Sequence, residues 1–171
     1  GSSKSALEMA TKAVEAEKNA GSLGILASAY ARAGDATAAH TNADAALAAG
    51  ANSSIAHVGK GDALMASGQA AEAAPAYQKA MSLDPKSIGA QVGAAYALVD
   101  AGKAAEAKTI AQKVTQQYPN SGPAFAVLGY SISGEKGFDG ADASWTDAIS
   151  QAQQGAFLAP KNPTIQMVVA K

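Results

Sequence analysis

The sequence predicts an all-α fold in which about ten helices form antiparallel pairs, with no β-sheet. Three glycines, Gly34, Gly68 and Gly102, lie 34 residues apart, and so do Pro85 and Pro119. A fixed period of this length indicates that one supersecondary unit is copied and stacked. The chain is also rich in alanine, the residue that favours helix most strongly. Period, helix-stopping residues and composition therefore agree on an array of helices.

Residues 54–87 show the content of one unit most clearly. Gly68 is expected to end a helix because glycine adopts the left-handed conformation without steric cost, and Pro85 ends the next because proline cannot continue it. Leu64 follows Gly61 by three residues on the first helix, and Ala73, Tyr77 and Ala80 follow one another by four and three on the second, the spacings of a buried helical stripe. The unit is therefore predicted to be a helical hairpin.

Corresponding positions can be followed through the four copies, with bulky residues at several of them replaced by alanine or polar residues in some copies. They are Leu23, Leu26, Ala27, Tyr30, Ala39 and Ala43; then His57, Lys60, Gly61, Leu64, Ala73, Tyr77 and Pro85; then Gln91, Ala94, Ala95, Leu98, Ala107, Ala111 and Pro119; then Phe125, Leu128, Gly129, Ile132, Ala148, Ala152 and Pro160. This pattern resembles the tetratricopeptide repeat, whose first helix carries a large residue, Leu, Gly or Ala, and Tyr, and whose second helix carries Ala, an aromatic residue and Pro. The resemblance implies a right-handed superhelical array of helix pairs, an α-solenoid, here lightly packed because several bulky positions are alanine.

The period divides residues 3–171 into one array. The expected parts are a partial repeat or capping helix at 3–19, full repeats at 20–53, 54–87 and 88–121, a longer repeat at 122–161, and a terminal helix at 162–171. The chain thus begins and ends halfway through a repeat. We expect either that it was cut from a longer protein or that single helices cover the ends of the array.

Two places depart from the regular pattern. From Pro119 to Pro160 is 41 residues, and the excess falls in the glycine-rich stretch 133–142, which we expect to form a surface loop. Phe138 in that loop either packs into the array or faces a partner. Pro75 lies about a turn into a second helix, so we expect a late helix start or a small kink there.

Composition excludes several classes of function. The 171 residues are 48% hydrophobic and 16% charged, with a net charge of −1 and no cysteine. Scattered basic residues do not suit nucleic acid, and no apolar stretch is long enough to span a bilayer. Without cysteine there is no disulfide or thiolate chemistry, an absence that leans slightly towards the bacterial periplasm or cell envelope.

No pattern of catalytic or metal-binding residues emerges. Ser131 follows only half of a nucleophile-elbow motif and lies in a predicted helix, where the required strained turn cannot form. The Gly59-Lys60-Gly61 segment lacks the spacing of a phosphate-binding loop. His40 and His57 lie on different helices with no second pair of ligands, and the acids near the 133–142 loop match no calcium-loop spacing. We expect no enzyme activity, metal or cofactor.

What remains is a surface. In proteins with this repeat the first helix of each hairpin lines the concave side of the superhelix, and we call the corresponding residues here the groove face. Its expected partner-binding residues are Val58, Asp62, Met65, Val92, Tyr96, Val99, Asp100 and Tyr130. The first copy adds Gly21, Gly24, Ser28 and Ala31, with Arg32 beside them, and Ile55 belongs to the second.

This face is mainly apolar and aromatic. Family members that hold a chaperone's terminal carboxylate use Lys, Asn and Arg along it, and those residue types are absent from the matching positions. We therefore expect a non-catalytic scaffold that binds an apolar helix or extended segment of another protein, for assembly or delivery within a bacterial complex. The alternatives are a self-associating structural element and an accessory domain of a larger enzyme.

Overall fold

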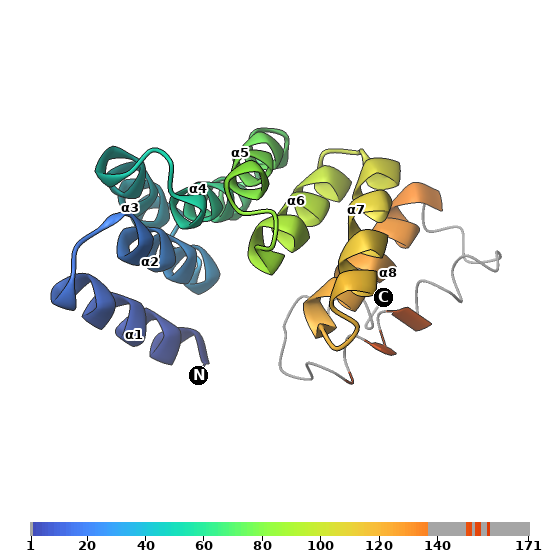
Figure 1. Cartoon of the computed structure of the whole chain (residues 1–171), viewed down its shortest axis with the longest axis horizontal. Helices are drawn as coiled ribbons and strands as arrows, with labels where there is room; N and C mark the ends of the chain where they lie inside the picture. Colours follow the sequence, from blue (N-terminus) through green and yellow to red (C-terminus); the bar gives the residue numbers. More distant parts are fainter. Residues whose placement is uncertain (1, 137–149, 152, 155–156, 158–171) are drawn as a thin grey trace. The chain divides into compact units, whose positions relative to one another are not determined.

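A computed structural model describes residues 2–136, 150, 151, 153, 154 and 157, and every regular element in this part of the chain is an α-helix (Figure 1). The helices are α1 (Ser2–Ala16), α2 (Ala20–Ala33), α3 (Ala36–Ala49), α4 (Ser54–Ala66), α5 (Ala70–Leu83), α6 (Ile88–Asp100), α7 (Ala104–Gln117) and α8 (Gly122–Lys136). The predicted fold class is confirmed over this part. The described residues form eight helices, whereas the sequence predicted about ten for the whole chain. The terminal helix expected at 162–171 lies outside the described residues.

The chain divides into two compact units, residues 1–93 and 94–171, with the division inside α6. In the first unit α2 packs against α1, α3 and α4, while α4 also packs against α3 and α5. In the second unit α7 packs against α8. From α1 to α5, and again at α7 and α8, helices that follow one another in the chain are neighbours in space, as expected for stacked hairpins.

Hydrogen-bonding side chains cap the first helix of each pair at the repeat period. The backbone N–H of Ser22 donates to Asn19 Oδ1 at 2.9 Å, and that of Ala56 donates to Ser53 Oγ at 3.2 Å. Two further caps of the same kind lie at Ser87 and Ser121. Each cap satisfies a helix N–H that has no partner within the helix, so the caps fix where α2, α4, α6 and α8 begin.

The helix ends also follow the period. Gly34, Gly68 and Gly102 adopt φ values of 84°, 73° and 77°, the left-handed region that closes the first helix of a pair. α5 stops at Leu83, before Pro85, and α7 stops at Gln117. The predicted stops are therefore confirmed.

The core of the first unit is built largely from small residues. Ala27, Ala39, Ala43 and Ala63 are fully buried in one cluster, and Leu23 packs with other alanines in a second. Such residues bury little area each, but they let helix axes come close together.

The closest approach in this unit brings the backbones of α2 and α4 together. A Cβ added to Gly24 would lie 2.6 Å from the carbonyl oxygen of Ile55, and one added to Gly59 would lie 2.6 Å from the carbonyl oxygen of Gly24. The sequence placed Gly24 on the groove face. That placement is wrong, because Gly24 is buried in the contact between the two helices.

Tyr77 of α5 is held between two glycines. A Cβ on Gly61 of α4 would lie 2.6 Å from the Tyr77 ring, and a Cβ on Gly93 of α6 would also overlap it. Tyr77 is buried, and its ring fills the space that these two missing side chains leave. An aromatic residue of one helix pair thereby contacts the first helix of the next.

Two local predictions need correction. α5 begins at Ala70, at the same place in its repeat as α3 and α7, so the late start expected from Pro75 is wrong. The expected loop 133–142 starts too early, because α8 continues to Lys136. A Cβ on Gly134 would lie 2.8 Å from Val99 Cγ1, so this turn of α8 packs against the second unit's own core. Phe138 and the rest of the expected loop lie outside the described residues.

The glycine cradle around Tyr77 leads to a test with a matched pair of variants. We expect Gly61→Ala to lower the free energy of unfolding by about 1–3 kcal/mol, because the added methyl overpacks a rigid ring. Gly89→Ala should instead raise it by about 0.5–1 kcal/mol, since nothing lies within 4 Å of the added methyl and alanine is the better helix former. Urea denaturation followed by circular dichroism measures both. Equal stability of the two variants would contradict the cradle.

Candidate functional site

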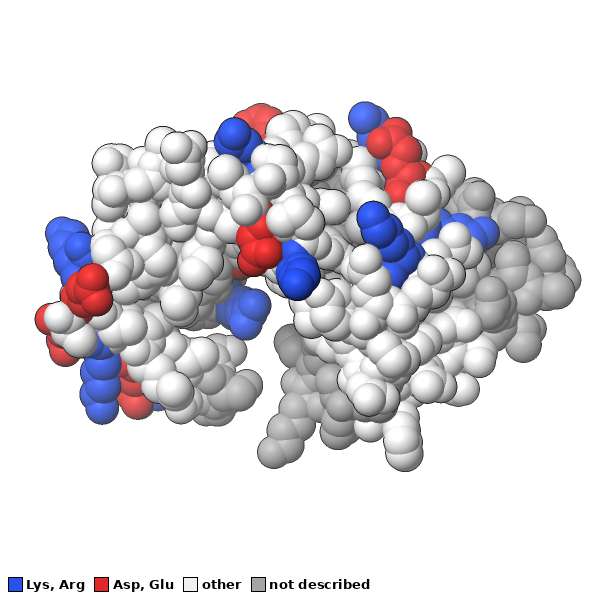
Figure 2. All heavy atoms as spheres, viewed as in Figure 1, with Lys and Arg blue, Asp and Glu red and all other residues white. Residues whose placement is uncertain are grey.

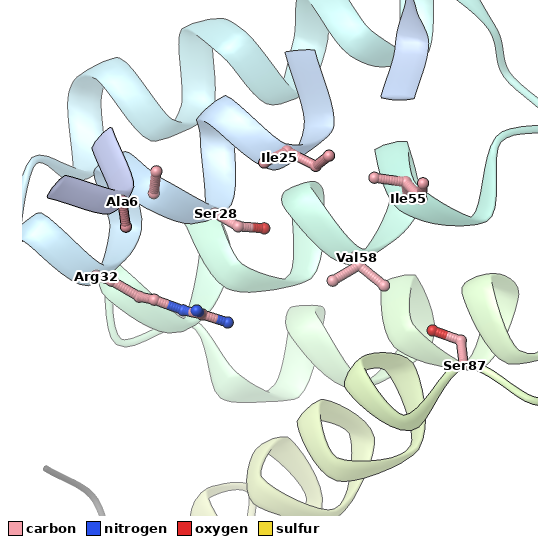
Figure 3. Close-up of a pocket in the computed structure, with 8 residues that line it drawn as sticks. Ala6, Ile25, Ser28, Arg32, Ile55, Val58 and Ser87 are labelled. Atoms are coloured by element: carbon pink, nitrogen blue, oxygen red, sulfur yellow. The ribbon is translucent and has the colours of Figure 1, made fainter. Parts of the chain in front are cut away.

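The first unit carries a hollow of about 270 Å³ beside α1, α2 and α4 (Figure 3). It is lined by Ala6, Ile25, Ser28, Ala29, Arg32, Ile55, Val58 and Ser87. Ile25 and Ile55 are 48% and 46% exposed, and they are among the few large apolar side chains left open in the described part of the chain. Most of the wall is aliphatic, and Figure 3 shows the side chains of Arg32, Ser28 and Val58 directed into the same space.

Helical spacing explains how these residues meet. Ile25, Ser28, Ala29 and Arg32 follow one another at steps of three, one and three along α2, so they share one face of that helix. Ile55 and Val58 are three apart on α4 and share the face turned towards them. Ala6 from α1 lines another part of the wall. The contact between Gly24 and Gly59 brings the two faces together.

The predicted groove-face residues of the first unit have different surroundings. Val58 lines the hollow, and Met65 is partly buried. Val92 is only 9% exposed, so it belongs to the core and offers a partner little surface. Asp62 is partly buried, and its Oδ1 accepts a 2.5 Å hydrogen bond from the Tyr77 hydroxyl.

Burial dominates the electrostatics of this tyrosine. Desolvation raises the pKa of Tyr77 well above its ordinary value, and the neighbouring charge and hydrogen bond of Asp62 raise it further. The positive charge of Arg32 acts in the opposite direction on the same pKa, which places that guanidinium within electrostatic reach of the pair. Asp62 Oδ2 is buried and has no hydrogen-bond partner among the described residues.

The second unit brings four predicted residues together. The rings of Tyr96 and Tyr130 lie with their centroids 5.7 Å apart, tilted by 39°. The Tyr130 hydroxyl donates to Asp100 Oδ1 at 2.6 Å, and Val99 packs beside them against α8. The Tyr96 hydroxyl is buried and has no partner in the described structure, so Tyr130 rather than Tyr96 presents the polar edge of this aromatic pair.

Both acids of the groove face therefore already accept a tyrosine hydroxyl. Acids that were free at the edge of this face would favour a segment carrying Lys or Arg. Asp100 is exposed and keeps a second oxygen, whereas the oxygen of Asp62 that is not bonded to Tyr77 is buried. The acid in the first unit is thus poorly placed to meet a cation from outside.

Sequence reasoning found part of the hollow and missed the rest. Ser28, Ile55 and Val58 were expected on the groove face, and Arg32 was noted beside it. Ile25 was missed because its repeat equivalents, Gly59 and Gly93, lie in helix contacts. Ala6 lies on α1 and Ser87 directly precedes α6, so neither belongs to α2 or α4. No periodic signal in the sequence could connect them to Ile25.

Other functions find no support in the described residues. Within that part of the chain no three His, Asp or Glu side chains gather in a way that could hold a metal ion, and none of the helices has the length and apolar character to cross a bilayer. His40 contacts Ser67 Oγ and His57 contacts the Ala51 carbonyl, each at 2.9 Å. Ser131 is buried in α8 and donates to the Val127 carbonyl, as the helical interpretation predicted. On the face shown in Figure 2, basic and acidic side chains are few and interspersed.

Two comparisons with known proteins bear on the sequence. Residues 64–128 match the family model described as tetratricopeptide repeat. No curated protein matches.

Several solved structures share the fold. TTC0263, a thermophilic TPR protein of Thermus thermophilus, has a TM-score of 0.75 at 14% identity over 98% of this chain and 89% of its own. YrrB, a TPR protein with an unusual peptide-binding site, has a TM-score of 0.64 at 20% identity over 99% and 84%. The second TPR domain of human RPAP3, in complex with the HSP70 peptide SGPTIEEVD, has a TM-score of 0.53 at 16% identity over 67% and 89%.

The tyrosines of the site lead to a prediction about pH. Burial, helped by the hydrogen bond and charge of Asp100, raises the pKa of Tyr130 from 10.0 to about 12, and burial raises that of Tyr96 as well. A pKa that is higher in the folded state means that folding favours the protonated hydroxyl. Its contribution to stability is complete below pH 10 and is lost as the pH rises towards 12. The urea midpoint should therefore fall between pH 10 and 12.

Two variants, Tyr130→Phe and Asp100→Asn, test whether ionisation of the Tyr130 hydroxyl causes this loss of stability. Tyrosinate absorbance should lose the amplitude of one hydroxyl near pH 12 in Tyr130→Phe, while Asp100→Asn should move that titration to lower pH and leave the burial contribution in place. An unchanged titration curve in both variants would refute the assignment.

Proposed function

We propose that this chain, whose residues 64–128 belong to the tetratricopeptide repeat family and whose described helices share its fold, is a non-catalytic scaffold that binds an apolar helix or extended segment of another protein. The observation that carries the proposal is the hollow of the first unit. Two isoleucines there remain about half exposed, whereas Leu23, Leu26 and Leu64 of the same two helices are buried. Exposed apolar surface in a concave site is typical of a place where a partner binds.

The nature of the walls indicates what kind of partner fits. A volume of about 270 Å³ lies below the roughly 300–1,000 Å³ of sites that enclose a whole small-molecule ligand. It suits one or two side chains projecting from a polypeptide. A helix or extended segment inserting aliphatic side chains beside Ile25 and Ile55 would exclude water from both.

The aromatic pair in the second unit offers a second contact area. Tyr130 is partly exposed, and tyrosine supplies apolar area together with a hydroxyl at its edge. Two of the proteins with similar folds support peptide binding as the mode, since one has a peptide-binding site and another was solved with a peptide. A role in assembly or delivery within a bacterial complex is part of the same proposal.

Random-peptide phage display against the whole chain provides a ligand with which to test this function. Peptides enriched in aliphatic residues should emerge. Ile25→Ala combined with Ile55→Ala should weaken the selected peptide by roughly 2–3 kcal/mol, because the two side chains supply most of the apolar wall. Fluorescence anisotropy with the synthetic peptide measures the dissociation constant.

Matched variants make this result specific. Met9→Ala removes an equally apolar side chain that is 70% exposed on α1 and does not line the hollow, so it should bind normally. Tyr130→Ala reports separately on the second unit. The proposal fails if no aliphatic peptide is enriched, or if the double isoleucine variant binds as tightly as the parent.

Self-association is the second candidate, and one observation favours it. Ala6 and Ala13 of α1 are exposed, whereas Ala73 and Ala80, which occupy the same repeat positions in α5, are fully buried. α1 thus leaves open a face of small residues against which another copy could pack. Light scattering over a concentration series should then show a mass above that of one chain, reduced by Ala13→Glu. A constant monomer mass would exclude this candidate.

A further inference from the structure

The described lining of the first-unit hollow carries positive charge and no negative charge. Among the described residues Arg32 is the sole cation in its lining, and the remaining lining residues are alanine, isoleucine, valine and serine. No Asp or Glu of the described part of the chain lines it. Any partner that fills the hollow therefore meets a single guanidinium set among aliphatic walls.

That guanidinium is not neutralised within the described part of the chain. The ion pairs there join Lys60 to Asp44 and Lys103 to Glu106, and Arg32 has neither an ion pair nor a hydrogen bond with a described residue. Asp62, the acid whose tyrosine partner feels the charge of Arg32, directs Oδ1 to the Tyr77 hydroxyl and has Oδ2 buried. Within the described part of the chain, no acid forms an ion pair with Arg32, and its positive charge is available to a partner.

We propose that this hollow selects segments carrying an Asp or Glu side chain next to an aliphatic residue, an inference that rests on the proposed function. The aliphatic side chain would lie against Ile25 and Ile55, and the carboxylate would accept two parallel N–H···O bonds from Arg32. Ser28, one helical turn before Arg32 on the same face of α2, presents a hydroxyl that can donate to the same group. Aliphatic walls that exclude water would strengthen these bonds relative to an exposed pair.

We place the carboxylate on a side chain of the segment and not at its carboxyl terminus. The apolar lining comes from three helices, with Ala6 on α1, Ile25 on α2, and Ile55 and Val58 on α4. A segment that covers all of it is longer than one terminal residue. The site also differs from a clamp of several basic side chains, because one arginine supplies all the positive charge of its described lining.

Peptide display separates this inference from the function on which it rests. The random-peptide library is panned against the wild-type chain, Arg32→Gln and the control Lys103→Gln, which removes the same charge from an exposed lysine of the second unit. Aliphatic residues should be enriched by all three proteins. Asp or Glu beside them should be enriched by the wild type and by Lys103→Gln, but not by Arg32→Gln.

A synthetic peptide from the wild-type selection completes the test. Replacing its Glu with Gln should weaken binding about tenfold to the wild type and leave binding to Arg32→Gln unchanged. Arg32→Lys keeps the charge but loses the planar guanidinium that can donate two parallel hydrogen bonds, so it should lose part of the affinity for the Glu peptide. The loss of affinity caused by replacing Glu with Gln should become smaller at high salt. Amidating the peptide's carboxyl terminus should change nothing. Circular dichroism confirms that each variant is folded.

The outcomes are distinct. Aliphatic enrichment without acidic residues, or equal affinity of the Glu and Gln peptides, overturns the inference and leaves the proposed function standing. A loss on amidation overturns it in favour of terminal carboxylate recognition. Absence of aliphatic enrichment with every protein removes the proposed function itself.

Discussion

Helix backbones in this chain approach one another closely because the residues between them are alanine and glycine. At the contact of α2 with α4 the space for a Cβ is already filled by the opposite backbone, and Gly24 and Gly59 leave it free. Where a gap would remain, one large side chain fills it, as Tyr77 does between Gly61 and Gly93. Small residues bury little area each, so stability depends on many short contacts and, between Gly61 and Gly93, on the ring of Tyr77.

Packing and hydrogen bonds within each unit also determine which side chains remain available to a partner. Tyr77 and Tyr130 pack through their rings and place their hydroxyls on Asp62 and Asp100, so the acids of the groove face are engaged by neighbours within their own units. A carboxylate that accepts a short hydrogen bond is less available to an incoming cation. The groups of the first unit that remain available to a partner are therefore apolar and positive, whereas the sequence predicted an apolar and aromatic face that includes Asp62 and Asp100.

Repetition also explains why the exceptions matter. A repeat position that lies in a helix contact in other copies is exposed to solvent in a copy that carries a different residue there. Ile25 occupies the position of Gly59 and Gly93, and Arg32 occupies that of Ala66 and Asp100. A surface isoleucine and a cation thus appear where the next two copies place a contact glycine, and an alanine or an anion. A site in such an array arises where the copies stop being equivalent.

The sequence by itself determined the architecture, because that information is local and repeated. The period, the glycines with positive φ and the prolines after α5 and α7 each act on a few neighbouring residues, and they correctly predicted where α2, α4, α5, α6 and α7 end. The capping residues at positions 19, 53, 87 and 121 carried the same period and could also have been read from the sequence. Only the tertiary structure decided which face residues are buried, as with Val92 and Gly24, and which side chains from α1, α2 and α4 surround one space. Those outcomes depend on the distance between helix axes, which is set by side-chain volumes on two helices at once and therefore has no signature in either helix alone.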